Sequence, residues 1–283
     1  MQFTMYSRFT SMLEQLGAEA AADYAADHGF SSVEMLEFAN PARPSVIPDR
    51  ETAKNVRKIL AQRGLTVACY SVCATLYRNP GAEESLRHHA EIAAELGCPF
   101  LHHTLLPWLK KTDDLPSFDE ALEITADAAA GVAKYAEPLG VTCLYEDQGL
   151  YANGVTGFGT FYREIRNRTA NVGVCGDVGN VLFVDESPIP FFREFIGDIR
   201  HVHIKDYHYR TDTSVSPGAR WLETGNGNWV SDCIFGQGDI DIAGCLEILK
   251  NAGYTGALAF ENEHPEPFDT GIKQCMDYLK RLI

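Results

Sequence analysis

Five glycines in this sequence stand at the same kind of boundary, between a helix-like run and a strand-like run. They are Gly29, Gly64, Gly97, Gly140 and Gly253, in the segments HGF, RGL, LGC, LGV and AGY. Glycine is favoured just after the last turn of a helix because it adopts the left-handed conformation without steric strain. The recurrence of one event, a helix that stops before a strand begins, predicts a chain built from repeated helix–strand units.

Strand-like and helix-like runs alternate along the whole chain. The strand-like runs lie at residues 3–6, 32–36, 65–71, 99–104, 141–146, 172–177, 199–204 and 256–261. The helix-like runs lie at residues 11–28, 49–63, 82–96, 117–138, 156–167, 188–196, 240–252 and 269–281. Such alternation implies a parallel sheet with helical crossovers, and eight units close naturally into a barrel. We therefore predict an α/β fold, a single (β/α)8 TIM barrel with parallel strands. A doubly wound open sheet is the alternative, weakened because no GxGxxG follows the first strand.

The length of the chain fits one such barrel. The sequence has 283 residues, and a barrel of this type typically needs about 250. We predict a single TIM-barrel domain over residues 1–283. One segment interrupts the alternation, a long loop at about 206–238 after the seventh strand, rich in Gly, Asn, Ser and Thr and containing two tryptophans. Loops of this length are usually functional or disordered, and the aromatic residues favour an ordered lid or binding loop.

Charge and hydropathy argue against several classes of partner. The net charge is −15, which disfavours nucleic acid as a partner because binding to a phosphate backbone depends on Lys and Arg. The sequence contains no apolar run of about 18 residues, as a transmembrane helix requires. Its N-terminus lacks the basic and apolar regions of a signal peptide. We expect a cytoplasmic protein that binds neither nucleic acid nor membranes.

Charged residues at the ends of the strand-like runs form the candidate site, because TIM-barrel active sites lie at the C-terminal ends of the strands. Glu146, Asp177, His203 and Glu261 lie at the ends of the fifth to eighth runs. Carboxylates brought this close repel one another, and an oxygen-rich set with one imidazole suits a divalent metal. On the residues alone, a network of hydrogen bonds and ion pairs without metal stays open as the alternative.

Several motifs resemble those of the sugar phosphate isomerase/epimerase family, the xylose isomerase-like TIM barrels. VTCLYED, GVCGDVGN, HVHIKD, GQGDID and LAFENEH follow one another from residue 141 to 264, and HGFSSVEML covers the second strand. The resemblance implies that Glu146, Asp177, His203 and Glu261 bind one divalent metal. Mn²⁺ is the expected ion, with Mg²⁺, Co²⁺ or Zn²⁺ as alternatives. A small-molecule sugar substrate is implied as well, and a homo-oligomer is compatible with the resemblance.

The same resemblance implies a metal-dependent isomerase or epimerase that acts on a keto sugar or related polyol through an enediolate. Glu146 and Glu261 are the expected catalytic residues, because the epimerase branch of the family uses those two positions for proton transfer. Two departures leave open a lyase on the same site, either an inosose-type dehydratase or a keto-glycoside-cleaving enzyme. Asn180 stands where sugar epimerases often carry His, and Tyr209 stands where some ketose epimerases carry Arg.

Two further activities are weighed against these. An abasic-site endonuclease, which also occurs in the family, needs more histidine ligands and a basic DNA-binding face, and the net charge of −15 disfavours it. A barrel that binds a ligand without catalysis is the other alternative. Metal analysis of the purified protein separates a binding barrel from an enzyme that depends on a divalent ion.

Four residues near the predicted site are expected to contact the substrate: Glu34, His103, Asn180 and Lys205. Glu34 lies near the end of the second strand, where it can orient a substrate hydroxyl or a catalytic histidine. His102 and His103 alternate in direction, so at most one of them points into the barrel. Lys205 shares the face of His203, where it binds a substrate oxygen, an enolate or a phosphate, or pairs with a carboxylate. Asn180 can hydrogen-bond a hydroxyl.

Overall fold

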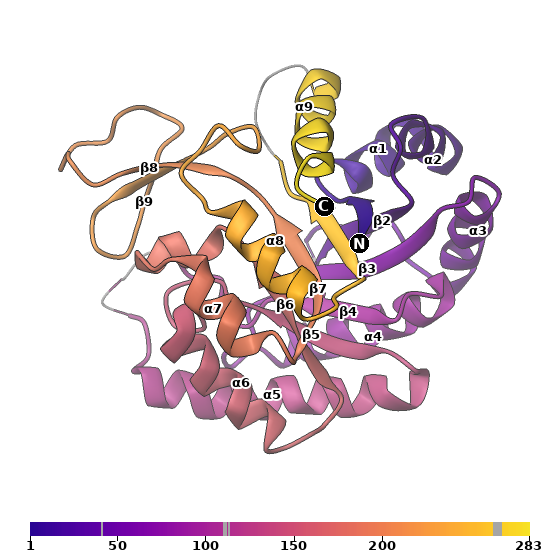
Figure 1. Ribbon diagram of the computed structural model, residues 1–283. Coiled ribbons are helices and arrows are strands. Elements are labelled where there is room, and N and C mark those ends of the chain that lie inside the picture. The colour runs from indigo at the N-terminus through magenta and orange to yellow at the C-terminus, as the bar shows by residue number, and fades with distance from the viewer. Residues whose placement is uncertain (41, 110–111, 113, 263–267) are drawn as a thin grey trace.

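Eight parallel strands close into a barrel in the computed structural model, which describes residues 1–40, 42–109, 112, 114–262 and 268–283. Around the barrel the strands follow the order β1, β11, β7, β6, β5, β4, β3, β2, and helices surround them (Figure 1). Their bounds are β1 (Gln2–Met5), β2 (Ser32–Phe38), β3 (Thr66–Cys73), β4 (Phe100–His103), β5 (Thr142–Glu146), β6 (Val172–Asp177), β7 (Ile199–Ile204) and β11 (Ala257–Phe260). The predicted TIM barrel is therefore confirmed.

The helices match the predicted helix-like runs, except that the first run contains two helices. Their bounds are α1 (Phe9–Leu16), α2 (Ala18–Asp27), α3 (Arg50–Ala61), α4 (Pro80–Leu96), α5 (Phe118–Ala136), α6 (Gly159–Arg166), α7 (Pro188–Phe195), α8 (Ile242–Asn251) and α9 (Phe268–Lys280). The first predicted helix is two helices, because Gly17 takes a φ of 84° between α1 and α2. All five boundary glycines have positive φ, from 70° to 82°, as their position after a helix predicts.

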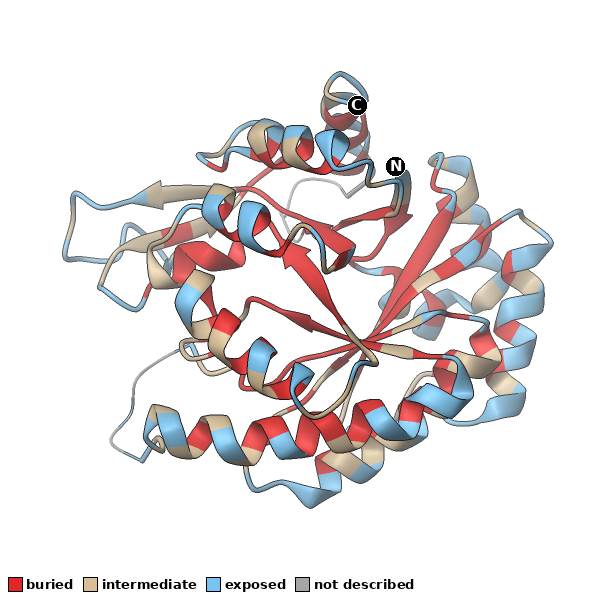
Figure 2. Cartoon of the chain, turned by 60° about the horizontal axis from the view of Figure 1, so that its bottom comes forward, coloured by how far each residue is buried: buried red, intermediate tan, exposed pale blue. Residues whose placement is uncertain are grey.

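The buried apolar side chains form two regions, one inside the barrel and one between the strands and the helices. Figure 2 shows the strands buried along most of their length and the helices buried only on their inner faces. On β5, Leu144 packs inside the barrel with Cys69 and Cys175. Tyr145 points the other way, and its hydroxyl donates to the carbonyl of Ala129 on α5 at 3.2 Å. The deep interior is therefore apolar, and the charged residues gather nearer the C-terminal ends of the strands.

The segment predicted as a long loop at about 206–238 contains a small sheet. The strands β8 (Tyr207–Arg210), β9 (Leu222–Glu223) and β10 (Trp229–Asp232) pair antiparallel in the order β8-β10-β9. The sheet projects from the side of the barrel, at the left of Figure 1. Asp206 anchors its base, because its carboxylate accepts backbone N–H bonds of 2.8 to 3.3 Å from Tyr207, Gly236, Gly238 and Ile240. The segment is thus more regular than a loop.

Asp185 ties this small sheet to the barrel. It follows the short helix η3 (Asn180–Val184), which comes directly after β6. Its carboxylate accepts bonds from the Tyr209 hydroxyl at 2.7 Å, the Thr224 hydroxyl at 2.8 Å and the Asn228 amide at 2.9 Å. One half-buried carboxylate therefore holds β8 and the β9–β10 connection together. Tyr209, which stands where some ketose epimerases carry Arg, is part of this contact.

Replacing Asp185 with glycine is expected to loosen the small sheet and leave the barrel intact. Glycine tolerates the φ of 60° found at this position, so the variant removes the carboxylate without adding backbone strain. Each lost hydrogen bond to a charged group is worth about 1.5 to 3 kcal/mol. Hydrogen exchange followed by mass spectrometry should show faster exchange over residues 207–232 and unchanged exchange in β5. Asp212→Gly changes an exposed carboxylate of the same segment, and equal effects of the two variants would contradict the prediction.

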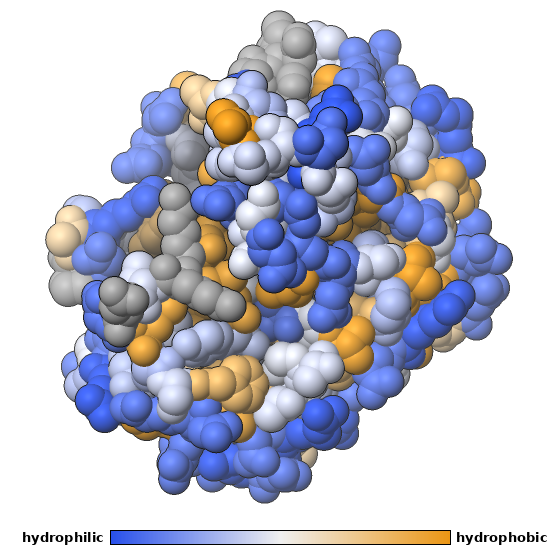
Figure 3. Space-filling view, turned by 90° about the vertical axis from the view of Figure 1, so that its left-hand side faces the viewer, coloured by the Kyte–Doolittle hydropathy of each residue, from blue (hydrophilic) through white to orange (hydrophobic). Residues whose placement is uncertain are grey.

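The face that carries the small sheet is largely hydrophilic, with separate apolar patches (Figure 3). Two large apolar side chains of this segment, Val215 and Leu222, are 70% and 51% exposed. Among the residues that the structure describes, no helix has the length and apolar character needed to cross a membrane. The expectation of a homo-oligomer stays a prediction.

Candidate metal centre

The four predicted metal ligands converge at the C-terminal ends of four neighbouring strands. Glu146 ends β5, Asp177 ends β6, His203 lies near the end of β7, and Glu261 follows β11. One side-chain donor atom from each lies within 4.8 Å of the others. Nδ1 of His203 is 2.7 Å from Glu146 Oε1, 3.3 Å from Glu261 Oε2 and 3.9 Å from Asp177 Oδ2. The side chain of Glu261 is 25% exposed and the other three are almost fully buried, so the cluster opens to solvent beside Glu261.

This donor set fits a divalent cation. Three carboxylates buried side by side repel one another unless positive charge lies between or beside them. Oδ1 of Asp177 accepts the backbone N–H groups of Gly179 and Asn180, both at 2.7 Å, which leaves Oδ2 facing the cluster. Carboxylate oxygens with one imidazole nitrogen suit Mn²⁺, Mg²⁺, Co²⁺ or Zn²⁺. The role of these residues as ligands stays a prediction that their geometry supports.

Glu34 orients the imidazole of His203 through its ring nitrogen Nε2. Its carboxylate accepts from Nε2 of His203 at 3.0 Å and from Nε2 of His201 at 2.6 Å. Burial by itself raises the pKa of Glu34, but the neighbouring His203 and His201 hold it well below its ordinary value. Because an ionised carboxylate only accepts hydrogen bonds, Nε2 of His203 carries a proton and Nδ1 faces the carboxylates. Tyr6 stacks on the same imidazole, with ring centroids 4.7 Å apart. A carboxylate behind a histidine is the usual support of a metal-binding imidazole.

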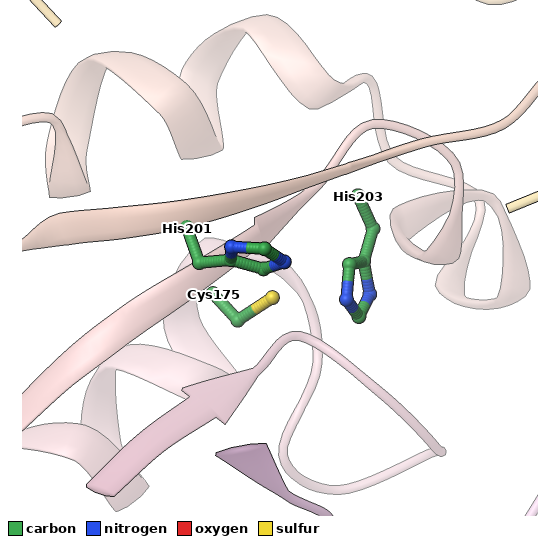
Figure 4. A group of neighbouring side chains, drawn as sticks. All are labelled: Cys175, His201 and His203. Atoms are coloured by element: carbon green, nitrogen blue, oxygen red, sulfur yellow. The ribbon is translucent and has the colours of Figure 1, made fainter. Parts of the chain in front are cut away.

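A second layer of side chains lies beneath the cluster. Figure 4 shows the imidazoles of His201 and His203 and the thiol of Cys175 gathered on the same side of β6 and β7. The two rings meet edge to face, with centroids 5.3 Å apart. Burial raises the pKa of the Cys175 thiol far above its ordinary value, and Nε2 of His201 is already bonded to Glu34 at 2.6 Å. We therefore assign His201 and Cys175 to the support of the cluster.

Two residues predicted to bind substrate lie elsewhere. β2 continues to Phe38, beyond its predicted end at residue 36, so Glu34 sits in the middle of the strand and is fully buried. His103 points out of the barrel, where its ring packs edge-on against Tyr145 with centroids 5.1 Å apart. The substrate-binding prediction is corrected for both. Glu34 takes its other predicted role, the orientation of a histidine, because it bonds His203, and His103 belongs to the interface between strands and helices.

His102 is the histidine of this pair that points into the barrel. Ser71 donates its hydroxyl proton to Glu34 at 2.5 Å, so its oxygen accepts from Nδ1 of His102 at 2.8 Å. Nε2 of His102 then carries a lone pair, is buried without a hydrogen-bond partner and lies 3.7 Å from Glu146 Oε2. Alternation predicted that at most one of the two histidines points inward. The register of β4 on β5, which pairs His102 with the inward Leu144, decided which one.

Lys205 and Asn180 both lie at the cluster. Nζ of Lys205 is 2.7 Å from Glu261 Oε1, 3.0 Å from Asp177 Oδ2 and 3.0 Å from Asn180 Oδ1. Of the interpretations left open for this lysine, the structure shows the pairing with carboxylates. Nδ2 of Asn180 is buried without a hydrogen-bond partner, so it has donor capacity for a ligand.

A cavity of about 630 Å³ adjoins the cluster, and Tyr6, Leu36, Phe38, Arg43 and Glu261 are among the residues that line it. Small-molecule sites usually have about 300 to 1,000 Å³, so the cavity is large enough for a substrate. It reaches the cluster on the side of Glu261, where that side chain is exposed. A substrate can therefore approach the cluster past Tyr6 and Glu261.

Replacing Glu34 with glutamine is expected to weaken metal binding about 10- to 100-fold, because the substitution removes the charged acceptor that orients His203. The neighbouring strand residue Glu37→Gln is the matched control. Glu37 is also buried, but it accepts backbone N–H bonds from Val46 and Ile47, away from the cluster. Titration with Mn²⁺ by calorimetry measures both variants. Equal affinities in Glu34→Gln and Glu37→Gln would show that Glu34 does not support the metal site.

Comparison with known proteins agrees with the parallel barrel. The family model for the xylose isomerase-like TIM barrel matches residues 22–282. The chain belongs to this family. A search of the curated proteins finds no match.

Solved structures resemble the whole chain at low sequence identity. D-psicose 3-epimerase from Clostridium cellulolyticum H10, solved with D-tagatose, has a TM-score of 0.76 and 15% identity, over 100% of this chain and 99% of that chain. The probable 3-DHS dehydratase AsbF from Bacillus anthracis has a TM-score of 0.72 and 15% identity, over 99% of both chains. IOLI protein with a bound zinc atom has a TM-score of 0.72 and 16% identity, over 100% of this chain and 98% of that chain. At these identities the likeness establishes the shared fold.

Proposed function

We propose that the protein is a divalent-metal-dependent isomerase or epimerase that acts on a keto sugar or related polyol through an enediolate. The observation that carries the proposal is the convergence of Glu146 and Glu261 on Nδ1 of His203, at 2.7 and 3.3 Å. Glu146, Asp177, His203 and Glu261 would hold the ion, with Mn²⁺ as the expected metal. The likeness to D-psicose 3-epimerase, solved with D-tagatose, supports the class of substrate.

Glu146 and Glu261 are the proposed acid–base pair. They stand at the two ends of the arc formed by β5, β6, β7 and β11, so they approach a substrate from different sides. One carboxylate takes the proton next to the carbonyl, and the other returns a proton. Return to the opposite face of the same carbon inverts it, and return to the neighbouring carbon interconverts aldose and ketose. Burial raises the pKa of Glu146 to about 7 in the absence of a metal ion, and a divalent ion bound beside it would hold the carboxylate ionised, as a base requires.

A divalent ion in this cluster would supply a Lewis acid that polarises the substrate carbonyl. The protein residues around it orient the substrate. Asn180 Nδ2, buried without a partner, is placed to donate to a substrate hydroxyl. Tyr6 covers His203 and limits the access of water from that side. Burial of the cluster strengthens each of these polar contacts.

A lyase on the same site is the second candidate, and the position of Lys205 favours it. The Lys205 ammonium lies 2.7 Å from Glu261 Oε1, so a general acid stands beside a general base. Glu261 would take the proton next to the carbonyl, and Lys205 would protonate the hydroxyl that leaves as water. The likeness to the probable 3-DHS dehydratase AsbF supports this candidate.

Incubation of the Mn²⁺-loaded protein with ketoses and inososes in D₂O separates the two candidates. Carbon-bound deuterium in a product of unchanged formula, measured by NMR and mass spectrometry, is the expected result for an isomerase or epimerase. A product that has lost water identifies the lyase. The absence of both exchange and water loss across the panel would overturn the proposed activity.

A further inference from the structure

Among the residues that the structure describes, Lys205 is the one lysine or arginine within bonding distance of the carboxylates of the cluster. It is only 3% exposed. Its ammonium donates hydrogen bonds to Glu261 Oε1 at 2.7 Å and Asn180 Oδ1 at 3.0 Å, and it forms an ion pair with Asp177 Oδ2 at 3.0 Å. The side chain is therefore held by two hydrogen bonds and one further ion pair.

Gly179 leaves the space that the aliphatic part of the Lys205 side chain occupies on its way to the cluster. A Cβ at this position would lie 2.6 Å from Cγ and 2.8 Å from Cδ of Lys205, both too close for a real contact. The φ of Gly179 is −117°, which any residue adopts, so the glycine is required here for space and not for backbone conformation. The sequence GDVGN therefore provides both the carboxylate of Asp177 and the room for the lysine that pairs with it.

Lys205 and a metal ion must share the same carboxylates. Asp177 has only Oδ2 to offer, because Oδ1 is taken by two backbone N–H groups. That Oδ2 faces both Lys205, at 3.0 Å, and Nδ1 of His203, at 3.9 Å. Glu261 divides its oxygens in the same way, with Oε1 toward Lys205 and Oε2 toward His203. The ammonium thus lies against two of the four proposed ligands.

We infer that Lys205 is a built-in counter-ion of the metal centre, which lowers its metal affinity and keeps the carboxylates together when the metal is absent. The inference rests on the metal site of the proposed function. Three carboxylates with one lysine carry a charge of −2, which one divalent ion neutralises. Without Lys205 the same carboxylates carry −3, so they attract a divalent ion more strongly and repel one another more strongly when it is missing.

Two neutral variants test this role, Lys205→Met and Lys205→Gln. Competition with a fluorescent indicator for Mn²⁺ should show affinities about 10- to 100-fold higher than that of the wild type, since one unit of positive charge has been removed next to the ion. Thermal unfolding should show a lower Tm than the wild type in EDTA, and a smaller difference in saturating Mn²⁺. A merely structural role of the lysine would lower the Tm equally in both conditions.

Two further variants control the result. Lys134→Met removes an exposed lysine on α5 and should change neither Mn²⁺ affinity nor the dependence of Tm on metal. Gly179→Ala keeps the charge of Lys205 but displaces the aliphatic part of its side chain. Like Lys205→Gln, this variant should therefore bind Mn²⁺ more tightly than the wild type. Unchanged or weaker Mn²⁺ binding in both Lys205 variants would overturn the inference. Absence of Mn²⁺ binding by the wild type would instead overturn the metal site itself.

Discussion

Replacing Glu146 or Glu261 with glutamine should lower turnover about 100- to 10,000-fold, the usual cost of losing a general acid or base. Each variant keeps the size of the side chain and removes its ability to take a proton. The assay measures formation of the product by NMR at saturating Mn²⁺, with Mn²⁺ affinity measured separately, since both residues are also proposed ligands. Glu247→Gln, an exposed residue on α8, should turn over at the wild-type rate.

The two variants also test whether the carboxylates serve opposite faces of the substrate. A variant that still binds Mn²⁺ retains one base, so it should exchange deuterium into substrate of one configuration and fail to invert it. Glu146→Gln and Glu261→Gln should then favour opposite configurations. The double variant should be little slower in turnover than either single one, because residues that act as a unit are not additive. Wild-type turnover in either single variant would contradict the assignment of the pair.

Removal of divalent ions with EDTA should abolish turnover and lower the stability of the folded protein. The cluster would then keep three carboxylates with Lys205 and His203 beside them to offset their charge. An ion that binds only the folded state stabilises it by about 2.7 kcal/mol at 100 times its Kd, so Mn²⁺ should raise the Tm in a concentration-dependent way. Thermal unfolding across a Mn²⁺ series measures this shift, and turnover should return with the ion.

His203→Ala is the variant that makes the metal experiment specific. It removes the imidazole whose Nδ1 faces all three carboxylates and leaves the carboxylates in place. Its Tm should respond only weakly to Mn²⁺, and turnover should stay low at any concentration of the ion. Full turnover of the wild type after exhaustive removal of metal, verified by elemental analysis, would rule out a metal-dependent reaction.

Much of the fold was predictable because its signals are local. A glycine after a helix and an apolar run before the next helix each reflect a few neighbouring residues, and the barrel follows from their repetition. The split of the first helix at Gly17 and the small sheet at β8 to β10 were missed. Gly17 lies inside a run of good helix formers. The strands β8 to β10 are short, and their pairing depends on contacts between residues far apart in the sequence, such as Asp185 with Tyr209 and Asp206 with Gly236.

The candidate site, like the fold, was predictable from the sequence only in part. The ends of strands β5, β6, β7 and β11 are predictable from the sequence, and with them the four proposed ligands. Of the two roles predicted for Glu34, substrate contact is wrong and orientation of a histidine agrees with the structure. The sequence does not decide between them, because the end of β2 depends on how far its neighbours continue to pair. Alternation predicts that at most one of His102 and His103 points inward, but the sequence holds no signal for which one, so the substrate contact predicted for His103 is wrong.

The amino-acid sequence by itself determined the alternation of strands and helices, and with it the four residues that meet at the end of the barrel. Such patterns are set by side-chain periodicity and helix termination, which act over a few residues. Only the tertiary structure decided which atoms face one another. Strand register, a contact between distant segments, turned His102 inward and placed Glu34 beneath His203. It also brought Lys205 between Asp177 and Glu261, where one ammonium and the proposed metal share the same carboxylates.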